Sequence, residues 1–206
     1  MPASTLKYAF ALPDSVNQMT GTVWNGGAQI DGGLILNWRT RLQQLLTGRL
    51  AFDVNLSGPQ TRIAGKISAS LFAVEARDVS GRLGPEILAA IEGVSQLACT
   101  STGVLSNINV LATRAKYGAN GQVDIGKGQC VDKAVGTVSI PAMRVVMVNR
   151  ANSAVVEVRP ANDANAIWGS IKVSPPANII LRVEPGGARQ IPGMPNSRAT
   201  IVEYNF

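Results

Sequence analysis

Apolar and polar residues alternate along most of the chain, with the period of two that is typical of half-buried β-strands. The segments with this pattern are 6–12, 50–56, 62–71, 143–150, 154–158, 167–173, 179–183 and 200–206. In the second of these, for example, Leu50, Phe52 and Val54 are separated by Ala51 and Asp53. The pattern predicts a mainly β protein whose antiparallel strands form an open barrel or a gutter-like curved sheet.

Turn-forming residues separate many of these segments. Residues 151–153 predict a hairpin turn, and the glycines of 118–121 and 126–128 predict two further turns. The Pro-Pro pair at 175–176 breaks the sheet, because proline cannot donate to a strand ladder. Residues 185–195, with three prolines and three glycines, predict a loop without regular structure.

The alternation changes parity after Leu71, where the apolar positions move to Phe72 and Val74. A shift of one residue moves side chains to the opposite face of a sheet. We therefore predict a bulge or bend at Leu71 and Phe72.

Two short segments, 38–47 and 85–92, have helical spacing. The apolar positions of the first are Leu42, Leu45 and Leu46. Gly48 follows the first helix as a stop signal, and Pro85 suits the first turn of the second. Because neither is long enough to be stable alone, we predict that both cover an end or a face of the sheet.

No change of composition marks a domain boundary, so we expect residues 1–206 to form a single β domain. Hydrophobic residues make up 46% of the chain and charged residues only 16%, which favours a protein that contacts other surfaces over a freely diffusing enzyme. No apolar run reaches the 18 residues expected of a membrane-spanning helix.

The net charge is +6, but the basic residues are scattered. No run of basic residues or aromatic-basic cluster offers a platform for nucleic acid, so we expect no nucleic-acid partner. The chain has no histidine, which excludes Ser-His-Asp and Cys-His nucleophilic sites. We expect no metal site and no cofactor, because two cysteines cannot form a four-thiolate zinc site and no phosphate-binding glycine motif is present.

Carboxylates are the remaining candidates for catalysis, since a pair of them could serve a glycosidase. The candidates in strand regions are Asp53, Glu75, Asp78 and Glu157. Each alternates with apolar residues, so we interpret each as a solvent-facing position and predict that the protein is not an enzyme.

The tryptophans Trp24, Trp38 and Trp168 are candidate structural or interface residues. Buried tryptophans often close the end of a β core, and exposed ones bind an apolar ligand or a partner. We predict that Trp24 and Trp38 are mostly buried near one end of the sheet, close to the helix at 38–47. The two cysteines, Cys99 and Cys130, form a disulfide if the chain is exported, or are two unrelated buried thiols.

Residues 20–67 contain an ordered set of short elements. A Gly-Thr-Val-Trp-Asn-Gly-Gly-Ala stretch at 21–28 is followed by a strand that ends in Trp38 and by a leucine-rich turn into Gly-Arg-Leu at 48–50. This order resembles protein N of the bacterial type II secretion system.

The resemblance implies an inner-membrane protein with one N-terminal transmembrane helix and a periplasmic β domain, and we expect that anchor to lie outside this sequence. It implies an accessory secretion component without catalytic residues, whose partners are other type II secretion proteins of the inner-membrane platform and the secretin. The periplasm permits a disulfide, and we predict one between Cys99 and Cys130.

Three functions remain open at this stage, and the third is an enzyme unrelated to the other two. The first is a non-enzymatic secretion component that acts through protein–protein contacts. The second is a carrier or sensor of a lipid or other apolar ligand in a β-groove. A continuous apolar concave face favours the second, whereas an exposed sheet edge favours the first, because an unpaired edge accepts a partner strand. We take the final strand, 200–206, as the candidate edge.

Overall fold

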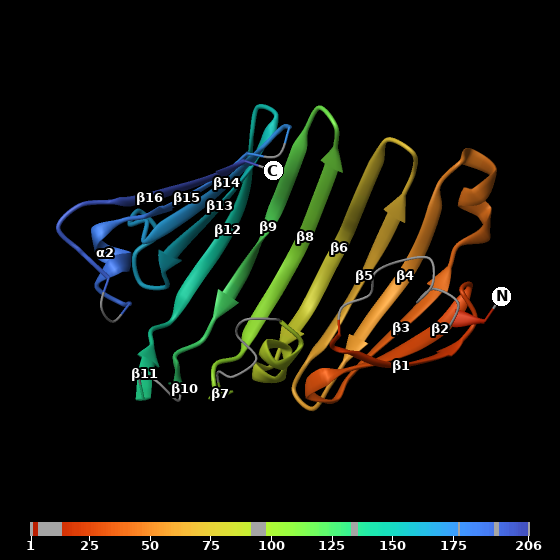
Figure 1. Cartoon of the computed structure of the whole chain (residues 1–206), viewed down its shortest axis with the longest axis horizontal. Helices are drawn as coiled ribbons and strands as arrows, with labels where there is room; N and C mark the ends of the chain where they lie inside the picture. The colour runs from red at the N-terminus through yellow and green to blue at the C-terminus, as the bar shows by residue number, and fades with distance from the viewer. Residues whose placement is uncertain are drawn as a thin grey trace.

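One large antiparallel sheet dominates the structure (Figure 1). The computed structural model describes residues 2–3, 14–91, 98–132, 136–176, 178–191 and 194–205. The sheet has thirteen strands in the order β1-β2-β3-β4-β5-β6-β8-β9-β12-β13-β14-β15-β16. Within the described residues β1 and β16 each have one partner strand, so the sheet stays open. The predicted gutter-like antiparallel sheet is confirmed.

The strands of this sheet run from six to eleven residues. Their bounds are β1 Val16–Gly21, β2 Asn25–Ile30, β3 Leu34–Thr40, β4 Leu50–Ser57, β5 Arg62–Ala69, β6 Ala73–Leu83, β8 Gly103–Thr113, β9 Tyr117–Ile125, β12 Met143–Arg150, β13 Ser153–Pro160, β14 Gly169–Ser174, β15 Asn178–Val183 and β16 Thr200–Asn205.

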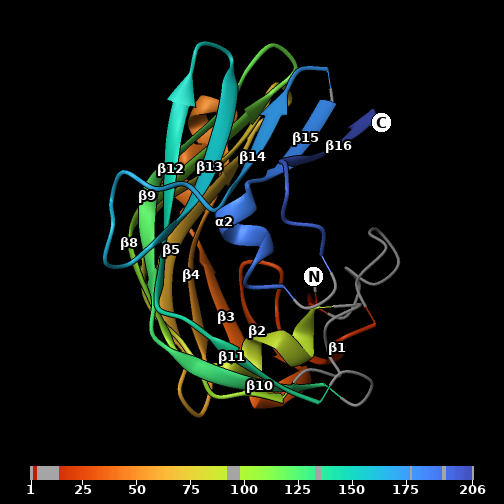
Figure 2. The same cartoon turned by 90° about the vertical axis from the view of Figure 1, so that its left-hand side faces the viewer.

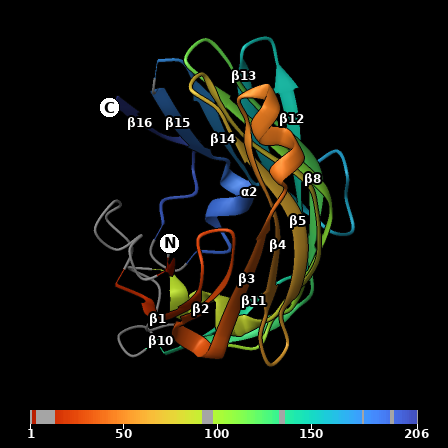
Figure 3. The same cartoon turned by 90° about the vertical axis from the view of Figure 1, so that its right-hand side faces the viewer.

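A three-stranded sheet and several short helical turns accompany the large sheet in the described residues. The small sheet has the order β11-β10-β7 and comprises β7 Ala98–Cys99, β10 Gly128–Asp132 and β11 Gly136–Ile140. The helical turns are η2 Asp31–Gly33, η3 Leu42–Thr47, η4 Pro85–Ala90 and α2 Pro185–Ala188. In the edge-on views the sheet is curved, and α2 lies on its inner side (Figures 2 and 3).

Irregular pairing accompanies the bend in the middle of the sheet. The register shifts where β5 pairs with β6, where β6 pairs with β8 and where β8 pairs with β9. Asp78 and Asn107 adopt left-handed backbone here, with φ of 54° and 49°. The side-chain oxygen of Asn109 accepts a hydrogen bond from the Asp78 backbone N–H at 3.0 Å. Bulges in adjacent strands increase the local twist and bend the sheet.

Most of the predicted strands are confirmed. The predicted segments and the strands that correspond to them are 50–56 (β4), 62–71 (β5), 143–150 (β12), 154–158 (β13), 167–173 (β14), 179–183 (β15) and 200–206 (β16). The hairpin turn at Ala151 and Asn152 and the break at Pro175 and Pro176 are also confirmed. The segment 6–12 lies outside the described residues.

Of the bulge or bend predicted at Leu71 and Phe72, the bend is confirmed, because the chain reverses there. These two residues form the tip of the β5–β6 hairpin, which closes with a hydrogen bond from the Ser70 N–H to the Ala73 carbonyl oxygen at 2.8 Å. The parity change therefore reflects two successive strands. A bulge within one strand would have left the chain direction unchanged.

The predicted turn at 118–121 is wrong, since these residues lie inside β9. Gly121 has a φ of 126°, and a Cβ atom there would lie 2.7 Å from the Cα atom of Ile108. The glycine thus permits a close backbone approach beside a bulge. The turn predicted at 126–128 is not found either, because residues 126 and 127 join β9 directly to β10 and Gly128 already belongs to β10.

The helix predicted at 38–47 begins too early. Trp38 belongs to β3, and the turn η3 begins only at Leu42. The helix predicted at 85–92 corresponds to η4, Pro85–Ala90, and residue 92 lies outside the described residues. Residues 185–195 are not wholly irregular, because they begin with the helical turn α2.

Candidate interaction surfaces

The concave face of the large sheet is apolar from end to end. Directly paired residues share a face, so the register defines rows across the strands. One row crosses β8 to β15 through Leu105, Val123, Val145, Val158, Gly169 and Val183. Another crosses β2 to β5 through Ala28, Leu36, Leu56 and Ile63. Val158, Gly169 and Val183 of the first row line a cavity together with Gly187 of α2. Because α2 lies on the inner side of the sheet (Figure 2), the apolar rows also lie on that side.

Near the C-terminal end of this face, α2 provides a local cover. Gly186 and Gly187 pack against Trp168, and a Cβ atom at Gly187 would lie only 2.1 Å from the Trp168 carbonyl oxygen. A cavity of about 240 Å³ remains beneath the turn, lined in part by Met143 and Leu181. The half-buried Trp168 is thus held between a strand and α2.

Near the N-terminal end, Trp24 and Trp38 line an apolar depression of about 350 Å³. The other lining residues are Met19, Val23, Leu36, Leu50, Phe52 and Val54. The indole Nε1–H of Trp38 donates to the Val23 carbonyl oxygen at 3.2 Å, which fixes the half-buried ring. Trp24 is 45% exposed, so the prediction that it is mostly buried is wrong.

The leucines of η3 are likewise more exposed than predicted. Leu42, Leu45 and Leu46 have exposed fractions of 60%, 39% and 92%. The turn therefore does not pack an apolar stripe onto the sheet. Its exposed side chains form a separate surface feature at the end of β3 and β4.

The convex face of the sheet carries ion pairs between neighbouring strands, together with exposed apolar side chains such as Ile35 and Val104. The Lys66 ammonium lies 2.8 Å from the Asp78 carboxylate, and this hydrogen bond lowers the pKa of Asp78. Arg41 lies 2.8 Å from Asp53, which raises the pKa of the Arg41 guanidinium. Asp53, Asp78 and Glu75 each contact a basic residue, so three of the four candidate carboxylates are structural ion-pair members.

Glu157 departs from the expectation of a solvent-facing carboxylate. The residue is only 4% exposed, although it lies on the convex face. Its Oε1 accepts from Arg150 at 3.0 Å and its Oε2 from Arg159. Two guanidinium groups compensate the buried charge. Alternation along the strand does not reveal these partners, so it predicted a solvent-facing carboxylate.

No metal-binding cluster of His, Cys, Asp and Glu occurs among the described residues. The candidate carboxylates lie on the convex face or in its ion pairs, away from the two apolar depressions. Within the part of the chain that the structure describes, no helix is long and apolar enough to cross a bilayer.

The last strand of the sheet is an exposed edge. β16 pairs with β15 along its length, from Asn178 with Asn205 to Val183 with Thr200, and has no second partner among the described residues. Ile201 and Tyr204 are 59% and 53% exposed. β16 contains no proline or lysine, the residues that commonly protect an edge from pairing.

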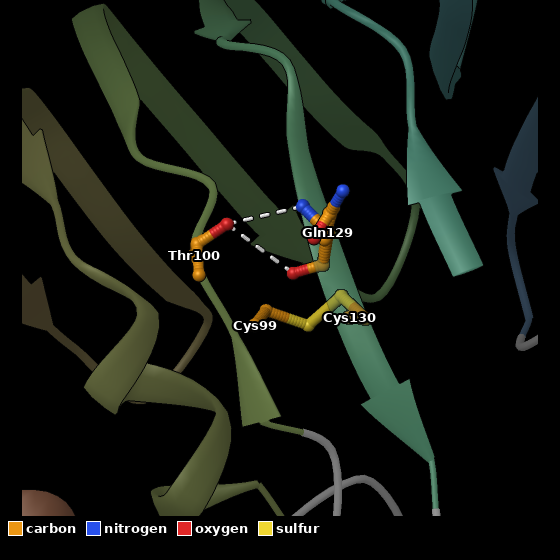
Figure 4. The surroundings of a disulfide bond; sticks show 4 residues. All are labelled: Cys99, Thr100, Gln129 and Cys130. Carbon is orange, nitrogen blue, oxygen red and sulfur yellow. Dashed lines mark hydrogen bonds between the residues drawn. A yellow bond between two sulfur atoms is a disulfide. The ribbon is translucent and has the colours of Figure 1, made fainter. Parts of the chain in front are cut away.

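Cys99 and Cys130 form a disulfide that joins β7 to β10, as predicted (Figure 4). The two residues are directly paired in the small sheet, and their Cα atoms are 4.0 Å apart. Beside them the Thr100 N–H donates to the Gln129 carbonyl oxygen at 2.9 Å, and the Gln129 N–H donates to the Thr100 hydroxyl at 3.0 Å. Disulfides of this kind persist in oxidising compartments.

Comparison with protein families gives one match. Residues 15–178 match the family model of protein N of the type II secretion system, from the start of β1 to the first residue of β15. Comparison with curated proteins and with solved structures gives no significant match. Because the family match covers most of the sheet, the chain belongs to the type II secretion system protein N family.

Proposed function

We propose that the chain is a non-enzymatic accessory component of the type II secretion machinery that acts through protein–protein contacts in the periplasm. Family membership implies an accessory role in type II secretion and interaction with other components of that system. The partners that we propose are the inner-membrane platform and the secretin. The disulfide supports a periplasmic location, because the periplasm is oxidising.

We further propose that the full-length protein is anchored in the inner membrane and presents residues 1–206 as a single periplasmic domain. The anchor itself would lie outside the sequence described here. Protease protection in spheroplasts tests this orientation. An epitope on the β12–β13 turn should be cleaved by added protease, and protection of that epitope would contradict the proposal.

The edge of β16, which has no second partner strand within the part of the chain that the structure describes, is the observation that carries the contact proposal. An unpaired strand offers a row of N–H and C=O groups to an incoming strand, and apolar side chains on both faces add area to such a contact. In β16 these include Ile201 and Val202, which are 59% and 37% exposed. We propose that a strand of a partner protein pairs with β16.

Proline substitutions in β16 test this contact. N–H groups of successive residues on an edge strand point alternately toward and away from the neighbouring strand. Ile201→Pro and Val202→Pro are therefore compared, because one removes an N–H directed to β15 and the other removes an N–H on the free side. The variant that retains the wild-type thermal unfolding should lose secretion of substrate into the medium.

A matched proline at Gln18 of β1 controls for the effect of proline on an edge. It should leave secretion intact if β16 is the contact. If both β16 variants fold and secrete normally, the edge proposal is wrong. Complete loss of function in a normally folded Asp53→Ala or Asp78→Ala variant would instead indicate chemistry.

The continuous apolar concave face favours a second candidate, a carrier or sensor of a lipid or other apolar ligand. The 350 Å³ depression at Trp38 and Phe52 offers an uncharged wall for an acyl chain. Organic extraction of the purified protein followed by mass spectrometry tests this function. A stoichiometric lipid, lost in a Phe52→Ser variant and needed for secretion but not for partner binding, would make this candidate the better one.

A further inference from the structure

One end of the large sheet is formed by hairpin tips with a common chemistry. Because the sheet is an antiparallel meander, alternate connections lie at the same end. At the upper end in Figure 1 they include 41–49 between β3 and β4, 70–72 between β5 and β6, 114–116 between β8 and β9, and 151–152 between β12 and β13. The β1–β2 turn belongs to the same end, since the Thr40 N–H at the end of β3 donates to the Trp24 carbonyl oxygen at 2.7 Å. We call these connections the basic hairpin end.

The basic hairpin end carries the most exposed large apolar side chains of the described residues. Leu46 is 92% exposed, Leu71 is 89% exposed and Phe72 is 74% exposed. Leu42 and Trp24 add further apolar surface at 60% and 45%. Single exposed apolar residues are common, but several on adjacent tips indicate an interaction surface.

The same connections carry only positive charge. Their ionisable residues are Arg41, Arg49, Arg114 and Lys116, and these fully described connections contain neither Asp nor Glu. Acidic residues do occur in the connections at the opposite end, where the described ones are Asp31, Glu86, Asp132, Asp163 and Glu184, beside the basic residues Lys127, Arg189 and Arg198. The charge asymmetry therefore follows the strand axis.

We propose that the basic hairpin end binds the surface of a bilayer that contains anionic phospholipids. Leu42, Leu46, Leu71 and Phe72 enter the boundary between headgroups and acyl chains, and Arg49, Arg114 and Lys116 lie at the phosphate level. This is the side-chain arrangement of peripheral membrane surfaces, in which apolar insertion and electrostatic attraction add. Arg41 is already paired with Asp53. The proposal does not depend on the protein–protein role of β16.

The spacing of the tips favours a bilayer over a protein partner. The β3–β4 and β8–β9 tips are four strand spacings apart, about 20 Å at the usual spacing of paired strands. Leu71, Phe72 and Arg114 border a shallow depression, but Leu46 projects from the separate turn η3. A fluid interface accommodates such separate projections without a complementary rigid surface.

Vesicle co-sedimentation tests the proposal with residues 1–206. One set of vesicles contains phosphatidylcholine alone, and the other contains equal parts of phosphatidylcholine and phosphatidylglycerol. The protein should bind the second set, and added salt should weaken the binding because exposed charges are screened. Absence of binding to the anionic vesicles overturns the proposal.

Variants at the tips assign the binding to this end. Removing one cation should weaken partitioning about fivefold, so Arg114→Gln combined with Lys116→Gln should weaken it by about a factor of 25. Leu46→Ser or Phe72→Ser should weaken it about tenfold, since each removes most of one inserted apolar side chain. All four positions are exposed, so the fold should be retained.

Two substitutions at the opposite end are matched controls. Lys127→Gln removes an exposed cation, and Ile191→Ser removes an apolar side chain that is 47% exposed. Neither should change vesicle binding. Equal weakening by these controls overturns the proposal. The proposal is also overturned if the tip variants lose secretion although the wild type binds no vesicles, because that result assigns the basic hairpin end to a protein partner.

Discussion

Cys99 on β7 and Cys130 on β10 lie directly opposite each other, and their bonded sulfur atoms hold together the small sheet below β8 and β9. The bridge joins residues 31 positions apart. Replacing both cysteines with alanine should lower the free energy of unfolding by about 3–4 kcal/mol, because the unfolded chain is no longer constrained. Urea unfolding monitored by circular dichroism measures the loss.

Reduction of the wild type with dithiothreitol is the matched control for this change. It should shift the urea midpoint by the same amount as the double substitution. Two titratable thiols in the folded protein before reduction would contradict the bridge.

Loss of the Glu157 carboxylate should destabilise the fold more than loss of an exposed carboxylate. The residue is 4% exposed and contacts both Arg150 and Arg159, so Glu157→Ala leaves a partly buried guanidinium without its partner. We expect a cost of about 2–3 kcal/mol in urea unfolding, reduced from that of a fully buried pair because Arg150 remains in contact with solvent. Asp53→Ala on the same face is the control and should cost clearly less. Equal costs would contradict the importance of burial.

The two N-terminal tryptophans should respond differently to truncation. Trp38 is half-buried, donates to the Val23 carbonyl oxygen and packs over Gly26, where a Cβ atom would lie 2.6 Å from the ring. Trp38→Ala should lower the free energy of unfolding by about 2 kcal/mol, less than a fully buried tryptophan would. Trp24→Ala should cost below about 1 kcal/mol because the side chain is already 45% exposed. Thermal unfolding of both variants checks the order, and a larger loss for Trp24 would reverse it.

The pKa of Glu86 gives the fold a defined acid sensitivity. Burial alone would raise this pKa, but the Gln60 and Thr61 backbone N–H groups each donate to Oε1 at 2.7 Å, and the pKa lies below its ordinary value of 4.5. The stabilisation is therefore fully present above pH 4.5 and is lost as the pH falls through the lower, folded-state pKa. Glu86→Gln should remove this part of the acid dependence.

Amide chemical shifts provide the direct check. The Gln60 and Thr61 amides should shift together with the Glu86 carboxyl carbon as the pH is lowered, because all three report one hydrogen-bonded group. A midpoint at or above the ordinary carboxyl value would contradict the predicted direction.

The sequence predicted the strands well because alternation is a local signal that any half-buried strand must satisfy. It failed where two strands meet or where a neighbour decides the conformation. At Leu71 and Phe72 the change of parity marks the turn between two strands, but the pattern alone does not distinguish such a turn from a bulge within one strand. Gly121 looks like a turn residue, although the close approach of Ile108 on the adjacent strand requires a glycine there. Pairing partners in space are not encoded in a pattern along one segment.

Surface properties were the least predictable. Glu157 has the same alternation as Asp53, and only its contacts with two arginines distinguish it. The η3 leucines were assigned to an apolar lid because spacing does not reveal whether a facing surface exists. The sequence does contain one unused signal for the basic hairpin end, since residues 41–49, 70–72 and 114–116 lack acidic residues altogether.

The meander has a consequence for how the protein folds and opens. Each strand of the large sheet pairs only with the strands before and after it in the sheet order, so most pairing joins segments close in sequence. Such quasi-one-dimensional ladders can begin to fold at any hairpin and extend in both directions. Hydrogen-exchange protection should therefore decline from the middle strands toward β1 and β16, and the outermost strand should detach first. A partner strand bound to β16 would turn that edge into an interior position and delay its detachment.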